Sequence, residues 1–274
     1  MRFNSPVNRK RSWSLPQQLR LRLSRVICTL VCEDKSNLYF SFVLFFGIYI
    51  GRQRNDSRLQ DTMSLSQGTR RLVGKLKPEA SVFLLCDIQE RFRPLIYHSE
   101  TVISTSRYLT SVAKALEIPV VVTQQYTKVF GETVKDCFAD PEDLKTVPIF
   151  EKKKFSMCTD DLSKHLESLN RQSVVLFGIE AHVCVQQTAL DLLEQGKDVH
   201  IIADGVSSQQ AYDREIAIQR LAQAGAFVTT AQSAAFMLMQ TAEHANFKAV
   251  SKLTVEHMKL PNEFNEDIQG KKEG

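Results

Sequence analysis

The sequence lacks the short motifs that mark the commonest cofactor and hydrolase sites. It has neither a GxGxxG dinucleotide fingerprint nor a GxxxxGK[ST] phosphate loop, and neither a GxSxG nucleophile elbow nor an HExxH zinc motif. Its six histidines form no set with the spacing of metal ligands. These absences argue against a nucleotide-dependent enzyme, an elbow-type serine hydrolase and a metalloenzyme, so we expect no metal and no cofactor.

Disulfide pairing is also poorly supported. The six cysteines are irregularly spaced, and a chain of 274 residues is long enough to bury a core without covalent staples. We therefore expect reduced thiols in an intracellular protein. Cys86, Cys137 and Cys158 are interpreted as packing residues.

Positive charge is concentrated at the start of the chain. Residues 1–62 hold 11 Lys+Arg against 4 Asp+Glu, whereas the rest holds 24 against 27. The net charge of +4 is therefore a property of this leader, and the body gives no electrostatic reason to expect a nucleic-acid partner.

The leader also contains the longest apolar run, residues 38–50, which is shorter than the ~20 residues needed to span a bilayer as a helix. Its basic, serine-containing start resembles a mitochondrial transit peptide. The alternatives are an anchor, with membrane contact only if the leader is retained, or a start-site artefact in which the product begins at Met63. We expect a cytoplasmic protein, or a mitochondrial one if the leader is genuine.

From residue 80 onward, short apolar runs alternate with segments of helical period. Strands are expected near 80–86, 119–123, 147–150, 173–177, 199–203 and 226–229, with helices between them. This alternation predicts an α/β fold, a three-layer α/β/α sandwich around a six-stranded, mostly parallel sheet. The domain is placed at 63–250, and the charged segment 251–274 is expected to be a disordered tail.

Ligands bind such sheets beyond the carboxyl ends of the strands, where several reactive side chains are expected. Cys184 follows a glycine-containing turn in the first turn of a predicted helix, and the helix dipole there favours a thiolate. Asp87, at the end of the first strand, is a candidate base, and the run 152–154 offers three candidate ammonium groups. From position alone, the alternatives of a packing cysteine, a capping aspartate and solvated lysines remain open.

Three ordered segments carry a more specific signal. Residues 85–92 (LCDIQERF), 152–157 (KKKFSM) and 178–185 (GIEAHVCV) resemble the signature segments of the isochorismatase-like hydrolases, and most closely the animal isochorismatase domain-containing proteins. The match extends from about residue 80 to 243.

The resemblance implies a sheet order of 3-2-1-4-5-6 and a catalytic triad of Asp87, Lys152 and Cys184. It also implies a cis peptide at Ile179–Glu180 that aims the N–H groups of Glu180 and Cys184 into an oxyanion hole. Side chains near these segments are expected to line the substrate pocket, namely Gln89, Phe92, Gln124, Tyr126 and Phe155.

One departure from the family bears on the substrate. Family members that hydrolyse nicotinamide bind a metal through an Asp-x-His pair after the second strand, whereas this chain has Gln124-Gln-Tyr126 there. This departure argues against nicotinamide as the substrate. The presence of Cys184 points toward a small amide or related acyl compound, cleaved through a thioester. The alternatives are a catalytically silent binding protein and a vinyl-ether hydrolase that uses the aspartate without the cysteine. A homo-oligomer is expected.

Overall fold

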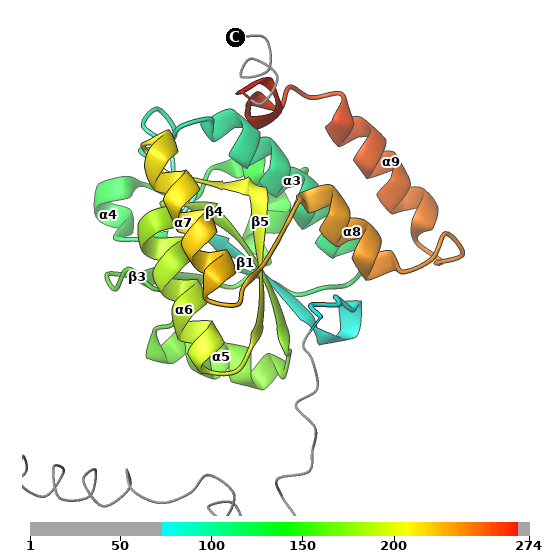
Figure 1. Ribbon diagram of the computed structural model, residues 1–274, viewed down its shortest axis with the longest axis horizontal. Helices are drawn as coiled ribbons and strands as arrows, with labels where there is room; N and C mark the ends of the chain where they lie inside the picture. The colour runs from blue at the N-terminus through cyan, green and yellow to red at the C-terminus, as the bar shows by residue number, and fades with distance from the viewer. Residues whose placement is uncertain (1–72, 268–274) are drawn as a thin grey trace, which may run out of the picture. The chain divides into compact units, whose positions relative to one another are not determined.

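The computed structural model describes residues 73–267, which alternate between strands and helices along the chain (Figure 1). The strands are β1 (Ser81–Cys86), β2 (Val120–Gln125), β3 (Ile149–Lys152), β4 (Ser173–Ile179), β5 (Asp198–Ser207) and β6 (Phe227–Thr229). The helices are α3 (Ser99–Ala115), α4 (Thr127–Phe130), α5 (Asp160–Leu169), α6 (Gln186–Glu194), α7 (Ala211–Gln223), α8 (Ala231–Met239) and α9 (Phe247–Met258).

The strands form one sheet in the order β3-β2-β1-β4-β5-β6, and every neighbouring pair is parallel. Every residue of the central strands β1 and β4 is buried, which explains their unbroken apolar sequences. The predicted fold class and strand order are confirmed.

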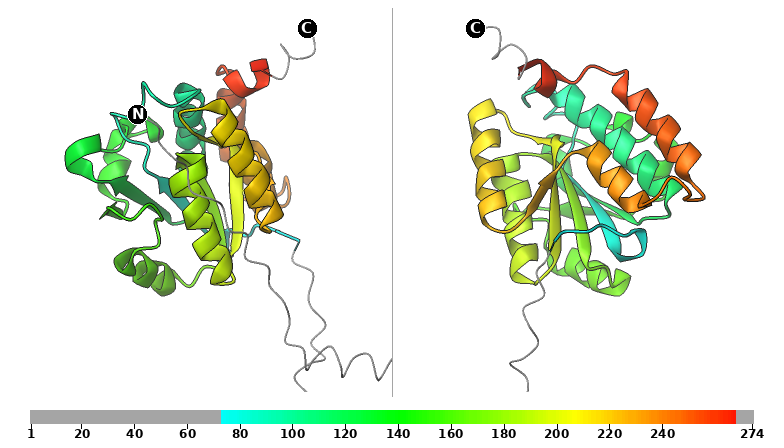
Figure 2. Two further views of the ribbon diagram at one scale, coloured as in Figure 1. Left: turned by 60° about the vertical axis from the view of Figure 1, so that its left-hand side comes forward. Right: turned by 45° about the vertical axis from the view of Figure 1, so that its right-hand side comes forward.

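Helices cover both faces of this sheet (Figures 1 and 2). The odd-numbered Phe83 and Leu85 of β1 belong to the core shared with α3, α8 and α9, and the even-numbered Leu84 and Cys86 to the core shared with α5, α6 and α7. This alternation follows from the period of two along a strand. The side chain of Cys86 therefore faces the layer that contains Cys184.

The expectation of a disordered tail is wrong for residues 251–267. Helix α9 continues to Met258, buries Val250 and Thr254, and joins α3 through a 2.8 Å hydrogen bond between Thr254 Oγ1 and the hydroxyl of Tyr108. The apolar residues of α9 recur at helical spacing, which is the sequence signal for this helix. The many charged residues of the segment hide that signal when only its composition is considered. The predicted leader 1–62 and the domain start at 63 lie outside the described residues. Within the described part of the chain, no helix combines the length and apolar character of a membrane span.

A buried histidine in β5 makes the stability of the fold depend on pH. His200 is 1% exposed, stacks on Phe227 and leaves its Nε2 without a hydrogen-bond partner among the described residues. Burial lowers the pKa of His200 to about 4, against about 6.5 in an unfolded chain. Because the unfolded state then binds the proton more tightly, the fold is expected to lose up to about 3 kcal/mol as pH falls from 6.5 to 4.

Replacing His200 with phenylalanine is expected to remove this loss, because the ring stays stacked and no proton is taken up. Urea unfolding of both proteins at about pH 7 and pH 4.5 measures the effect. An equal loss of stability in both proteins at the lower pH would assign the acid sensitivity to other groups.

Candidate active site

An ion pair lies at the carboxyl edge of the sheet. Asp87 directly follows β1 and Lys152 is the last residue of β3, with β2 between them. Lys152 Nζ lies 2.6 Å from Asp87 Oδ2, and the two side chains are 0% and 2% exposed. The structure therefore brings two of the three predicted catalytic side chains into direct contact, out of reach of bulk water.

The ammonium of Lys152 is fully occupied by oxygen acceptors. Besides Asp87, it donates to Gln125 Oε1 at 2.7 Å, to the carbonyl of Phe155 at 2.8 Å and to that of Lys154 at 3.2 Å. Burial alone lowers the pKa of Lys152, but nearby Cys86, Asp87 and Cys184 outweigh burial and raise it. Since an ammonium has only three N–H groups, Lys152 is a fixed positive charge rather than a donor to a ligand.

The carboxylate of Asp87 is held by neighbours on both oxygens. Thr123 donates its hydroxyl to Oδ1 at 2.8 Å, and the thiol of Cys86 lies 3.6 Å from Oδ2, the oxygen that also binds Lys152. The backbone of Asp87 lies in the left-handed region at φ 53°, so the extended conformation of β1 ends before this residue. These contacts fix the carboxylate in one orientation at the strand end.

Cys184 enters the site from the opposite side of β1. It lies in a π-helical turn over Ala181–Val185 that leads into α6, and it is 5% exposed. Its carbonyl accepts a 2.6 Å hydrogen bond from Thr188 Oγ1, which ties the wide turn to the first turn of α6. Single π-helical turns are frequent at functional sites, because the extra residue re-aims a side chain.

The predicted cis peptide at Ile179–Glu180 is wrong, since no peptide bond in the described residues is cis. The chain reverses instead through Glu180, which takes the left-handed conformation at φ 55° and ψ 60°. Gly178 precedes it at φ 144°, where a Cβ atom would lie 2.1 Å from the carbonyl oxygen of Cys86. Glycine is thus needed for this turn to pack against the end of β1.

The side chain of Glu180 is engaged next to the segment that follows β5. Its Oε1 accepts a 2.7 Å hydrogen bond from Gln209 Nε2, and its Oε2 lies 3.5 Å from His182 Nδ1. His182 Nδ1 is in turn 2.9 Å from Ser208 Oγ. These contacts hold the Glu180 side chain in place. An oxyanion requires a hydrogen-bond donor, which at Glu180 is the backbone N–H.

Two of the residues predicted to line a substrate pocket are shielded from solvent, and their side-chain amides hydrogen-bond to other parts of the protein. Gln89 is 0% exposed and donates its amide to the carbonyls of Gln125 and Gly131, while its Oε1 accepts from Gln125 N. Gln124 bonds Thr133 through Nε2 and Thr127 through Oε1. Gln89 connects the loop after β1 to the end of β2 and the loop that follows it, and Gln124 connects β2 to that same following loop.

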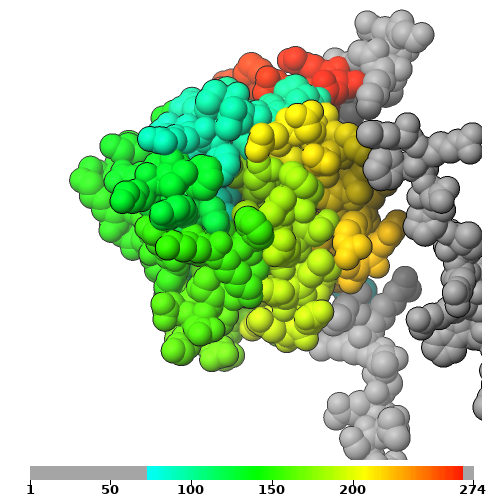
Figure 3. All heavy atoms as spheres, turned by 90° about the vertical axis from the view of Figure 1, so that its left-hand side faces the viewer, coloured from blue at the N-terminus to red at the C-terminus, as the bar shows by residue number. Residues whose placement is uncertain are grey.

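The other three predicted pocket residues are more accessible. Phe155 is 54% exposed and Tyr126 is 37% exposed, with Lys153 Nζ 5.0 Å from the centre of the Tyr126 ring. Phe92 stacks on Phe130 with ring centres 4.5 Å apart. The segments that carry the site, coloured cyan, green and yellow-green, adjoin one another on the face shown in Figure 3.

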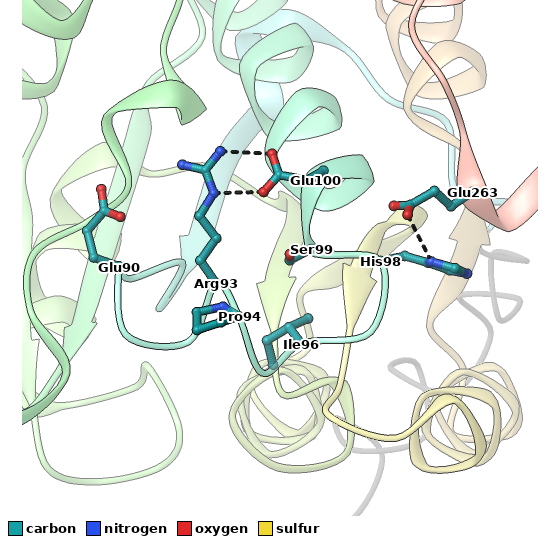
Figure 4. Close-up of a pocket in the computed structure, with 8 residues that line it drawn as sticks. All are labelled: Glu90, Arg93, Pro94, Ile96, His98, Ser99, Glu100 and Glu263. Carbon is teal, nitrogen blue, oxygen red and sulfur yellow. Dashed lines mark hydrogen bonds and ion pairs between the residues drawn. The ribbon is translucent and has the colours of Figure 1, made fainter.

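The loop after β1 is anchored beside a cavity of about 500 Å³ (Figure 4). Arg93 pairs with Glu100 at 2.7 Å and with Asp136 at 3.0 Å, and His98 lies 3.4 Å from Glu263. These contacts restrain the loop that carries Gln89 and Phe92. The cavity itself lies outside the Asp87–Lys152 cluster.

Two polar residues of β2 that the sequence analysis does not select contact the ion pair directly, namely Thr123 and Gln125. Cys86 packs in the core as predicted, and its thiol also lies 3.6 Å from Asp87 Oδ2. Alternation along β2 was the available signal, because Thr123 and Gln125 share one face of the strand. In the described part of the chain, no three His, Cys, Asp or Glu side chains cluster in a way that suits a metal ion.

Comparison with known proteins identifies the family. Residues 81–233 match the model of the isochorismatase domain. The chain is 46% identical to the secreted isochorismatase effector Isc1 of Phytophthora sojae, over 74% of this chain and 97% of that protein. It is 42% identical to isochorismatase domain-containing protein 2 of Xenopus laevis, over 68% of this chain and 89% of that protein.

Solved structures agree. The MAR1 ribonuclease of Caenorhabditis elegans is 42% identical, with a TM-score of 0.62 over 66% of this chain and 92% of that one. The YcaC gene product of Escherichia coli, an octameric hydrolase of unknown specificity, shares the fold at 20% identity, with a TM-score of 0.62 over 72% of this chain and 98% of that one. The chain therefore belongs to the family of isochorismatase-like hydrolases.

Proposed function

We propose that this protein hydrolyses a small amide or related acyl compound, with Cys184 as nucleophile and Asp87 as its base. The observation that carries the proposal is the buried 2.6 Å pair of Asp87 and Lys152 at the carboxyl edge of the sheet. Cys184 packs in the same core cluster as Cys86, whose thiol lies 3.6 Å from Asp87 Oδ2. A buried, oriented carboxylate beside a thiol and a fixed ammonium is the arrangement that covalent acyl transfer requires.

In this mechanism, Asp87 accepts the proton of the Cys184 thiol as the sulfur attacks the carbonyl carbon. The backbone N–H groups of Glu180 and Cys184 donate to the oxyanion. Asp87 then returns the proton to the leaving amine, which departs and leaves a thioester on Cys184. Water, deprotonated by Asp87, attacks the thioester and releases the acid and the thiol.

Lys152 contributes charge rather than a proton. Since its three N–H groups are taken up by Asp87, Gln125 and the carbonyl of Phe155, it lowers the free energy of the anionic cluster without leaving its place. Gln125 and Thr123 keep this arrangement fixed during the cycle, which reduces reorganisation on the way to the transition state.

The experiment is a search for the thioester. The full chain is incubated with a panel of small aliphatic and aromatic amides and esters and with single-stranded RNA, since one relative at 42% identity is named a ribonuclease. After acid quenching, mass spectrometry of the tryptic peptide 172–197, in which Cys184 is the only cysteine, is expected to show an acyl adduct with a cleaved substrate.

Turnover that persists after Cys184 is alkylated would overturn the covalent mechanism and favour ether or phosphodiester cleavage. Absence of turnover and of adducts across the panel would favour a binding protein. We further propose a homo-oligomer, supported by the octameric neighbour that shares the fold, and light scattering of the purified chain tests it.

A further inference from the structure

A second thiol lies inside the proposed site without a part in the reaction. Cys86, the last residue of β1, is 0% exposed, and its Sγ lies 3.6 Å from Asp87 Oδ2. Cys86 and Cys184 both belong to the core between the sheet and α5, α6 and α7, and Cys184 is one of the neighbours that raise the pKa of Cys86. Two thiols and one carboxylate therefore form a continuous cluster.

The backbone holds the two cysteines near each other. Cys86 pairs with Gly178 in the register of β1 and β4, and the turn that begins at Gly178 leads to Cys184. A Cβ atom at Gly178 would lie 2.7 Å from the Cβ of Cys86, so only glycine allows this approach. The proximity is a consequence of the central strands and does not depend on a surface loop.

The two thiols are not equivalent. Burial, followed by the contacts with Cys184 and Asp87, raises the pKa of Cys86 well above its usual value. Cys86 therefore stays protonated at neutral pH and does not compete with Cys184 as a nucleophile.

We propose that Cys86 is a resolving thiol, which forms a reversible disulfide with Cys184 after a hydroperoxide has oxidised Cys184. The inference rests on the proposed function, because it takes Cys184 to react as a thiolate. The disulfide would inactivate the proposed active site under oxidising conditions, and its reduction would restore the free thiol of Cys184.

The chemistry balances in two steps. The Cys184 thiolate attacks one oxygen of the hydroperoxide, the O–O bond breaks, and the sulfur becomes a sulfenic acid while hydroxide or alkoxide leaves. Cys86 then attacks the sulfenic sulfur as Asp87 takes its proton, and the S–OH oxygen departs as water with that proton. Sulfur is oxidised by two electrons in total, and the hydroperoxide is reduced to water or an alcohol.

Contact with Asp87 gives Cys86 the base that its raised pKa requires, since Oδ2 lies 3.6 Å from its sulfur. A disulfide brings two sulfurs to about 2.05 Å, so the side chains of Cys86 and Cys184, which pack in the same core, have to approach one another when the bond forms. The bond would remove the nucleophile and protect it from irreversible oxidation to the sulfinic acid.

The test is peptide mapping of the full-length protein after mild oxidation. The reduced chain is treated with hydrogen peroxide near pH 7, quenched with N-ethylmaleimide in acid and digested with trypsin without reductant. We expect peptide 76–91, in which Cys86 is the only cysteine, to be linked to peptide 172–197, and dithiothreitol to release both. The proposal would be overturned if peroxide converted Cys184 of the wild type to the sulfinic acid while Cys86 remained a thiol. It would also be overturned if Cys184 did not oxidise.

Matched variants separate a resolving role from simple packing. In Cys86→Ala and Cys86→Ser, Cys184 is expected to proceed to the sulfinic acid several times faster than in the wild type, with no linked peptide. Cys158→Ser removes another buried thiol of the same core and is expected to leave the cross-link unchanged. Equal sulfinic acid formation in the wild type and both Cys86 variants would contradict the inference.

The two proposals fail in different ways. A Cys184 that is acylated by the substrate panel but never linked to Cys86 would remove the resolving role alone. A disulfide that forms in a chain that hydrolyses nothing would remove the proposed activity and leave the redox pair in place.

Discussion

Replacing Lys152 by methionine is expected to lower the free energy of unfolding by about 3–5 kcal/mol, because the carboxylate of Asp87 would be left charged and buried without its partner. Turnover is expected to fall with it, since no other ammonium takes the place of Lys152. Urea unfolding near pH 7 and assay of the folded fraction measure the two effects separately.

Two companion variants identify the cause. Lys154→Met removes an ammonium that pairs with Asp191 at 3.1 Å while 54% exposed, and it is expected to change stability by no more than about 0.5 kcal/mol. The double variant Lys152→Met/Asp87→Asn removes both charges and is expected to recover at least half of the lost stability. If Lys152→Met lowered the free energy of unfolding as little as Lys154→Met, the buried Asp87–Lys152 pair would contribute no more to stability than an exposed ion pair.

Much of the fold is predictable from sequence because its central strands are buried on both faces. Unbroken apolar runs at Ser81–Cys86 and Ser173–Ile179 identify two such strands, and helical periods between the runs require parallel crossovers. The carboxyl-edge rule then selects Asp87 without any knowledge of its contacts.

The selection of a particular lysine needs more than composition. Lys152, Lys153 and Lys154 are identical in chemistry, and the resemblance to the family selects Lys152. The structure supplies the physical difference, because Lys152 is the last residue of β3 and is buried, whereas Lys153 and Lys154 lie beyond the strand and are exposed. A strand period of two places Lys152 and Lys154 on the same face, so alternation alone does not choose between them.

Other features cannot be inferred from local sequence. The π-helical turn before α6 and the left-handed Glu180 result from packing against the end of β1, for which residue propensities give no signal. Cys86 and Cys184 are almost a hundred positions apart, and the pairing of β1 with β4 brings them into the same core cluster. Such proximity is a property of strand register and appears only once the sheet is assembled.

Replacing Cys184 by alanine is expected to reduce turnover by at least about a thousandfold, because the remaining thiol of the cluster, Cys86, is fully buried and its raised pKa keeps it protonated. Stability is expected to change by about 1 kcal/mol or less, since a small buried side chain loses one sulfur atom. Cys184→Ser keeps the geometry but replaces the thiol by a far weaker acid, so a loss of at least about a hundredfold is expected there too. The measurement is kcat on a substrate found in the panel, with unfolding curves for each variant.

The matched control is Cys158→Ala, which removes another buried thiol from the same core. The kcat of Cys158→Ala is expected to equal that of the wild type. A fall in kcat seen only in Cys184→Ala would then be due to the lost nucleophile and not to altered packing. Full turnover in Cys184→Ala, combined with loss in Asp87→Asn, would instead show that the carboxylate acts without a covalent intermediate. That outcome would move this chain from acyl transfer to direct acid–base cleavage, with Lys152 still required to hold Asp87 in place.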